Sequence, residues 1–96
     1  MENRKTLAIV DLKRLLRKIF GEEISKEILE CLKDNKIDDF LMFNRYIDSD
    51  NDKRDLLEKA ELLIKEIDRG DSDWDCIGKL FETINGIAEN DLLINR

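Results

Sequence analysis

The chain has 96 residues, of which 42% are apolar and 42% are charged, and its formal net charge is −6. This length suits a single domain, residues 1–96, with one core, and the apolar content is too high for a disordered acidic chain. Proline is absent and only four residues are glycine, so the composition favours an all-α protein over a loop-rich one.

The cysteines and the hydropathy pattern bear on the compartment. Cys31 and Cys76 lie within apolar patterns and not at paired spacings, so we expect two free thiols, with a disulfide as the less favoured alternative. Charges interrupt the only early apolar run, so no signal peptide is predicted, and no stretch reaches the roughly 18 apolar residues of a membrane helix. We therefore expect a soluble, cytoplasmic protein without membrane insertion.

The charge is unevenly distributed along the chain. Residues 1–20 hold six basic and two acidic side chains, whereas the remainder is strongly acidic. An acidic body argues against nucleic-acid binding, because contacts with phosphates need a cationic face. The basic segment alone can touch an anionic membrane. Opposite charges on one small domain are also typical of a module that self-associates or docks to a partner.

Apolar residues at helical spacing predict six short helices joined by tight turns. The first covers about residues 7–20 and has Gly21 as its C-cap. The second starts at Glu22 or Ser25 and ends by about Lys36, with acidic residues in its first turns, where the helix dipole favours them.

The third helix is short and reads DDFLMFNRYI. Its cap is Asp38 or Asp39. Helical spacing allows Phe40, Phe43 and Ile47 to share one side of it, with Leu41 and Met42 beside them.

The fourth helix, over 56–67, is the clearest, and a stretch with two interpretations follows it. RGDSDWDCIGKLFETI begins with an adhesion tripeptide, but the same residues suit a structural turn. We expect Gly70 to end the fourth helix in the left-handed conformation. One of residues 71–73 then caps a fifth helix over 74–84. We favour the structural interpretation, since no sign of secretion accompanies the tripeptide.

The fifth helix begins with Trp74, the only tryptophan, and Asn85-Gly86 is expected to end it before a last short helix over 87–94. Trp74 falls on the same side as Ile77 and Phe81. We favour core packing for Trp74, and the alternative is a partly exposed anchor for a partner.

The residue types leave little room for catalysis or metal binding. Histidine is absent, which removes the commonest general base and transition-metal ligand, and no nucleophile or phosphate-loop signature occurs. DSDNDKRDLLEK matches a calcium loop at Asp48, Asp50 and Asp52, but Lys53 and Lys59 stand where that loop needs glycine and glutamate. We therefore expect a protein that is not an enzyme, with no catalytic residues, metal or cofactor, and with Asp50 or Asp52 as a helix cap.

A family resemblance follows from the second half of the chain. LLEKAELLIKEIDRGDSDWDCIGKLFETINGIAENDLLI contains a leucine-rich helix, a glycine turn, a tryptophan-led helix and a final apolar segment. It resembles caspase-recruitment domains of the death-fold superfamily, and its early tryptophan is similar to that of RIG-I-like receptors and the mitochondrial antiviral adaptor. LRKIFGEEISKEILECLKDNKI is similar to the first two helices of these domains. The resemblance covers about residues 7–94 and implies a six-helix antiparallel bundle of Greek-key type.

The resemblance also implies a function. It implies a non-enzymatic adaptor module that binds another caspase-recruitment domain, either a second copy or an adaptor, in cytoplasmic innate-immune or cell-death signalling. Such domains associate through a basic patch on helices one and four and an acidic patch on helices two and three, often as oligomers or filaments. The residues implied here are Lys13, Arg14, Arg17 and Lys18 on the basic side, and Glu27, Glu30, Asp34, Asp38 and Asp39 on the acidic side. For any one of them, the alternative is an ordinary solvated charge on a helix face.

A second function also fits the composition. Richness in lysine, isoleucine, glutamate, aspartate and asparagine, together with the acidic net charge, is typical of a small stand-alone inhibitor or immunity protein of bacterial or phage origin. Such a protein neutralises a cationic target, binds through its acidic faces and stays monomeric.

Overall fold

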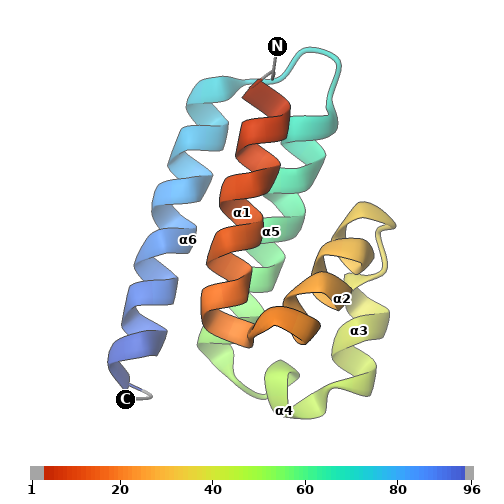
Figure 1. Ribbon diagram of the computed structural model, residues 1–96, viewed down its shortest axis with the longest axis vertical. Coiled ribbons are helices and arrows are strands. Elements are labelled where there is room, and N and C mark those ends of the chain that lie inside the picture. Colours follow the sequence, from red (N-terminus) through yellow and green to blue (C-terminus); the bar gives the residue numbers. More distant parts are fainter. Residues whose placement is uncertain (1–3, 95–96) are drawn as a thin grey trace.

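The computed structural model describes the backbone of residues 4–94 and the side chains of residues 4–92 (Figure 1). Over this range the protein is an all-α, six-helix bundle without strands, which confirms the predicted fold class. The helices are α1 (Arg4–Phe20), α2 (Glu22–Lys33), α3 (Ile37–Phe43), α4 (Arg45–Asp48), α5 (Asn51–Asp68) and α6 (Trp74–Ile94).

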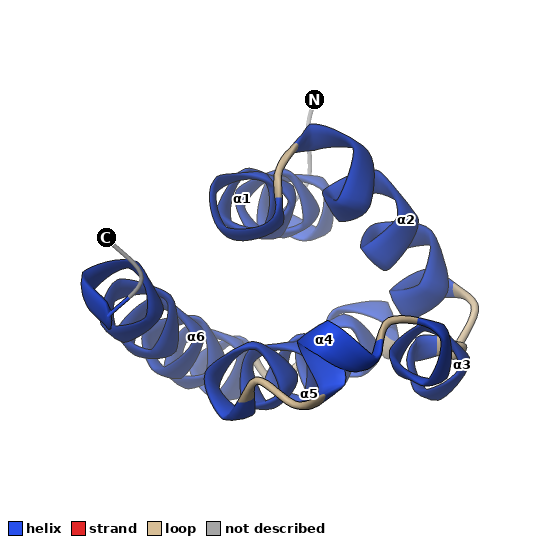
Figure 2. Ribbon diagram, turned by 90° about the horizontal axis from the view of Figure 1, so that it is seen from below, coloured by secondary structure: helices blue, strands red, loops and turns tan. Residues whose placement is uncertain are grey.

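The helices form two layers, seen end-on in Figure 2. α5 and α6 make an antiparallel hairpin, and α3 and α4 extend this curved layer on the far side of α5. α1 and α2 pack against each other and cover the concave side. α1 and α6 run in the same direction, and α5 runs opposite to both (Figure 1).

The core lies between these two layers. Leu12 and Leu16 of α1 are fully buried there, because α1 presents every third or fourth residue to the layer below. α5 is central and contributes the largest share, with its apolar stripe buried along its whole length. Further fully buried apolar side chains come from α2, α4, α5 and α6, and they include Ile28, Leu32, Ile47, Leu56, Leu57, Leu63, Ile67 and Ile84.

The expectation of one helix over DDFLMFNRYI is wrong, because Asn44 divides it into α3 and α4. Asn44 has φ −127° and ψ 64°, outside the helical region, and its Nδ2 donates a hydrogen bond to the carbonyl of Phe40 at 2.8 Å. This side-chain bond competes with the helical pattern of the backbone. α3 also starts at Ile37, before either expected cap, so Asp38 and Asp39 lie in its first turn and neither is its cap.

The expectation that Asn85-Gly86 ends a fifth helix is also wrong, because α6 continues without interruption to Ile94. Ile77, Ile84 and Ala88 are all buried, so the apolar stripe against α5 stays in phase through this point. A helical glycine costs only about 1 kcal/mol relative to alanine. Packing against α5 outweighs that cost, since tertiary contacts provide most of the stability of a helix.

Two residues with positive φ shape the turns around α2. Gly21, at φ 87°, separates α1 from α2 and donates its N–H to the carbonyl of Arg17 at 2.9 Å, which confirms its predicted role. Asn35, at φ 58°, ends α2. The N–H of Lys36 then reaches the carbonyl of Cys31 at 2.8 Å, the longer bond of a Schellman motif.

Candidate protein-interaction surfaces

The outer side of α1 carries positive charge. Because its apolar residues face the core, the basic residues between them must point outward. Arg14, Arg17 and Lys18 are exposed and Lys13 is partly exposed. The helix contains six basic residues and a single acidic one. We call Lys13, Arg14, Arg17 and Lys18 the basic face.

The predicted acidic residues are exposed on the neighbouring helices. The acidic face consists of Glu27 and Glu30 on α2, Asp34 at the C-cap of α2, and Asp38 and Asp39 in the first turn of α3. Asp38 and Asp39 lie at the N-terminal end of α3, where the positive end of the helix dipole favours acidic side chains.

The negative field of the acidic face acts on a nearby thiol. Partial burial is the main cause that raises the pKa of Cys31, and the charges of Glu27, Asp34 and Glu30 add to it. A thiol with a raised pKa is a poor nucleophile at neutral pH. Both cysteines are free, as predicted.

The two faces remain unpaired within one molecule. Among the described residues, none of the nine charged side chains forms an intramolecular ion pair. Figure 2 shows α2 lying between α1 and α3, and the two faces belong to different elements, the basic face to α1 and the acidic face to α2 and the start of α3. Both faces are therefore free to meet charges on another molecule.

The calcium-like stretch is instead a helix start. The side chain of Asp50 caps α5 and accepts the N–H of Lys53 at 3.2 Å. The Lys53 ammonium also lies 3.0 Å from Asp50 and 3.1 Å from Asp91. Nowhere in residues 4–92 do three potential ligands gather into a group that could hold a metal ion.

This polar cluster was not predicted from the sequence, because Asp91 resembles any other surface acid there. In the structure Asp91 is only 4% exposed. Its position on the stripe of α6 that faces α5, seven residues after Ile84, is the signal that would have indicated burial.

The pKa values in the cluster respond to competing effects. Partial burial works to raise the pKa of Asp50, but the hydrogen bonds from the Lys53 ammonium and N–H outweigh it and lower that pKa. Burial likewise works to lower the pKa of Lys53, but the bonds to Asp50 and Asp91 outweigh it and raise that pKa. Both shifts favour the ionised pair.

The RGD tripeptide forms the turn between α5 and α6. Arg69 is the C-cap of α5, and its φ of −64° and ψ of 146° are those of an extended backbone. In the described chain, positive φ occurs only at Gly21 and Asn35. The left-handed conformation expected of Gly70 is therefore wrong. The extended Arg69 already turns the chain out of the helix, so no positive φ is needed.

Side chains hold this turn in place from both sides. Asp73 caps α6 by accepting the N–H groups of Asp75 and Cys76 at 3.1 and 3.2 Å. The carboxylate of Glu66 accepts the N–H of Asp73 at 2.9 Å and pairs with Arg69 at 3.0 Å. These two bonds, the backbone one first, lower the pKa of Glu66.

Trp74 has features of both predicted roles, core packing and a partly exposed anchor. It is partly buried and packs against the core at the start of α6. The guanidinium of Arg4, the first residue of α1, lies over its ring, 4.8 Å from the centroid, in a cation–π contact.

A group of exposed apolar side chains occupies the junction of α3 and α4. Phe43 is 84% exposed, Tyr46 66% and Met42 64%. Phe43 does not share the buried side of Phe40 and Ile47, because Ile37, Phe40 and Leu41 form the buried side of α3 and Ile47 belongs to the separate helix α4. We call Met42, Phe43 and Tyr46 the aromatic corner.

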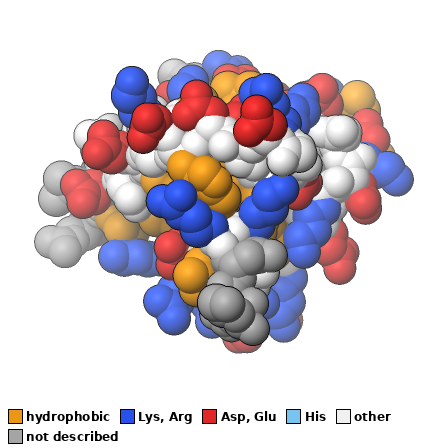
Figure 3. Space-filling model, turned by 90° about the horizontal axis from the view of Figure 1, so that it is seen from above, with side chains coloured by type: hydrophobic (Ala, Val, Ile, Leu, Met, Phe, Trp, Pro, Cys, Tyr) orange, Lys and Arg blue, Asp and Glu red, His pale blue; other side chains and the backbone are white. Residues whose placement is uncertain are grey.

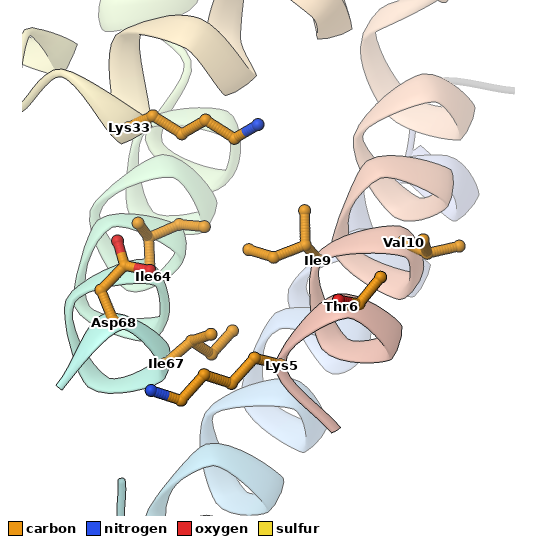
Figure 4. A pocket seen from close by; sticks show the side chains of 8 residues that line it. All are labelled: Lys5, Thr6, Ile9, Val10, Lys33, Ile64, Ile67 and Asp68. Atoms are coloured by element: carbon orange, nitrogen blue, oxygen red, sulfur yellow. The ribbon is translucent and has the colours of Figure 1, made fainter. Parts of the chain in front are cut away.

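A groove of about 510 Å³ opens between α1 and α5 (Figure 4). Ile9 of α1 and Ile64 and Ile67 of α5 point into it. The remaining lining residues are Lys5, Thr6, Val10, Lys33 and Asp68. Seen from above, the surface at this end of the molecule has a hydrophobic hollow bordered by basic side chains (Figure 3).

None of the described helices combines the length and the apolar character needed to cross a membrane. A scan against protein-family models found no match for this chain, and searches of curated proteins and of solved structures found none either.

Proposed function

We propose that the protein is a non-enzymatic interaction module whose basic face binds the acidic face of another copy or of a related domain. One observation carries this proposal. Nine exposed or partly exposed charges of opposite sign lie on separate helices, and none has an intramolecular ionic partner among the described residues.

The physical chemistry of such a contact predicts its behaviour. An exposed ion pair is worth only about 0–1 kcal/mol, so several pairs must act together. Their sum falls as salt screens them. Because two different faces meet, the contact is heterologous and can continue from copy to copy into a ring or a filament.

The finer assignment is also a proposal. The leucine-rich helix, turn and tryptophan-led helix support a death-fold domain of the caspase-recruitment type, with Greek-key topology. This would place the interaction in cytoplasmic innate-immune or cell-death signalling. The uninterrupted α6 departs from the separate fifth and sixth helices that the resemblance implies.

Light scattering of the purified chain at low and high salt tests the interaction. We expect large species at low salt that dissolve as salt is added. Arg17→Glu and Glu30→Arg should each abolish assembly. Lys79→Glu and Glu89→Arg make the same charge changes at exposed positions of α6, outside both faces, and should assemble like the unaltered chain.

Mixing the two interface variants gives the sharper result. Arg17→Glu retains its acidic face and Glu30→Arg its basic face, so the mixture should form a heterodimer that does not grow further. Assembly that survives both variants would contradict the proposal. A chain that stays monomeric under all conditions and binds a cationic protein through its acidic residues would favour the inhibitor alternative.

A further inference from the structure

The groove between α1 and α5 has the composition of a binding site for an apolar group. Its base is formed by Ile9, Ile64 and Ile67, and Val10 stands at its edge, 40% exposed. Its volume of about 510 Å³ lies within the roughly 300–1,000 Å³ of typical ligand pockets. Such a groove accepts an apolar side chain of the size of an aromatic ring.

The aromatic corner contains three of the six large apolar side chains that are exposed among the described residues. Isolated exposed apolar residues are common in soluble proteins, but three within five positions of the chain mark a contact surface. Phe43, the most exposed of them at 84%, is also the last residue of α3. It therefore projects from a corner, where a partner can enclose it.

The groove and the corner lie at opposite ends of one molecule. The groove is formed by the first turns of α1 and the last turns of α5, whereas α3 and α4 meet at the other end (Figure 1). A single chain therefore cannot place its own Phe43 in its own groove. A second copy supplies the missing partner for each.

The charges around the two sites also match. Asp38 and Asp39 precede the aromatic corner, and the surface beside Met42 also carries Asp48 and Glu58 together with Arg45 and Arg54, so acids outnumber bases there. Around the groove the arrangement is opposite in sign, with two cations and one acid. Figure 4 shows that these groove residues are Lys5, Lys33 and Asp68.

We propose that the aromatic corner of one copy inserts into the groove between α1 and α5 of the next copy. This inference rests on the proposed function and identifies the apolar contact within it. In this contact Asp38 and Asp39 of the acidic face lie toward Lys5 and Lys33 at the groove, and Glu27, Glu30 and Asp34 are the acidic residues left to meet the basic face. Because the corner and the groove are different surfaces, the contact is heterologous and leaves one free site at each end of an assembly.

Two variants test the two sides of this contact one at a time. Phe43→Ser removes the inserted side chain, and Val10→Glu places a charge at the edge of the groove. Both positions are exposed, so circular dichroism and thermal unfolding should show folded proteins. Each variant should weaken self-association about 30-fold, the effect of losing a central aromatic anchor.

Matched controls use exposed apolar residues outside the contact. Leu62→Ser on α5 corresponds to Phe43→Ser, and Leu7→Glu on α1 corresponds to Val10→Glu with the same change of charge. Neither Leu7 nor Leu62 lines the groove. Both controls should associate like the unaltered chain in sedimentation velocity.

The mixture of Phe43→Ser and Val10→Glu decides the proposal. Phe43→Ser keeps an intact groove and Val10→Glu an intact corner, so together they should form a dimer and nothing larger. A mixture that remains monomeric, or self-association unaffected by Phe43→Ser, overturns the insertion. If Arg17→Glu still abolishes assembly in that case, the proposed function stands without it, whereas an unaltered chain that never associates overturns both.

Discussion

The ammonium group of Lys53 lies 3.1 Å from the buried carboxylate of Asp91 and ties the first turn of α5 to the last part of α6. Asp50 caps α5 and binds the same ammonium at 3.0 Å. Beside them, the amide of Asn90 donates to Asp52 at 3.1 Å. This end of the α5–α6 hairpin is thus held by polar contacts, whereas its middle is held by apolar packing.

Replacing Lys53 by methionine should lower the free energy of unfolding by about 1–3 kcal/mol, because the ion pair between Lys53 and the buried Asp91 is lost. Urea unfolding followed by Trp74 fluorescence measures this. The double variant Lys53→Met/Asp91→Leu should recover part of the loss, since no carboxylate then remains buried without the ammonium. Lys59→Met removes a partly exposed pair with Asp55 and should change stability by less than about 1 kcal/mol. If Lys53→Met and Lys59→Met lowered the free energy of unfolding equally, this result would contradict the assigned role of Lys53.

The same cluster makes stability depend on pH. The pKa of Asp50 is lowered from its ordinary value of 3.8, so the unfolded chain binds this proton first as the pH falls. The contribution of Asp50 is therefore complete above that value and is lost as the pH drops through the lowered pKa. Unfolding curves from neutral to acidic pH should show a shallower acid loss for Asp50→Asn. Parallel curves for the two proteins would show that Asp50 does not contribute in this way.

At alkaline pH, stability depends on pH in the opposite direction because of Lys53. The pKa of Lys53 is raised from its ordinary value of 10.5, so its contribution is complete below that value. It is lost as the pH rises through the raised pKa. Lys53→Met should lack this alkaline loss when it is compared with the unaltered chain in the same titration.

Two glycines should respond in opposite directions to alanine. Gly86 lies inside α6 with open space around it, so Gly86→Ala should raise the free energy of unfolding by about 0.5–1 kcal/mol. Gly21 has φ 87° and ψ 171°, which alanine adopts only with strain, so Gly21→Ala should lower it by about 1–3 kcal/mol. Thermal unfolding of both variants checks this, and a destabilising Gly86→Ala would indicate that the helix breaks there.

The turn between α5 and α6 offers a test of its structural role. Asp73→Ala should cost about 1 kcal/mol, because two N–H groups of α6 lose their acceptor. Asp71, the acidic residue of the RGD tripeptide, is exposed, and Asp71→Ala should leave stability almost unchanged. A larger loss at Asp71 than at Asp73 in chemical unfolding would reverse the assignment of the cap.

Local patterns in the sequence were sufficient for much of the fold. The apolar periodicity of 7–20 and 56–67 identified the helices whose buried residues include Leu12, Leu16 and Leu63. Gly21 could be recognised because only glycine adopts its conformation without strain. The exposed position of the predicted charges followed from the same periodicity, since residues between apolar ones point away from the core.

Other features depended on contacts between segments distant in the chain. Asn85-Gly86 is a stop signal in isolation, and only the surface of α5 keeps α6 helical through it. Phe43 belongs to an apolar pattern, but only Ile37, Phe40 and Leu41 of α3 pack into the core and the ring of Phe43 is left in solvent.

The sequence by itself therefore determined the helical class, the positions of the main helices and the separation of basic and acidic residues, because these depend on spacing along one helix. Only the tertiary structure decided that Asp91 is buried against Lys53, that α6 is continuous and that a groove lies opposite the aromatic corner. These outcomes depend on which side chains from different helices meet, and the energy of such contacts exceeds the local preferences of single residues.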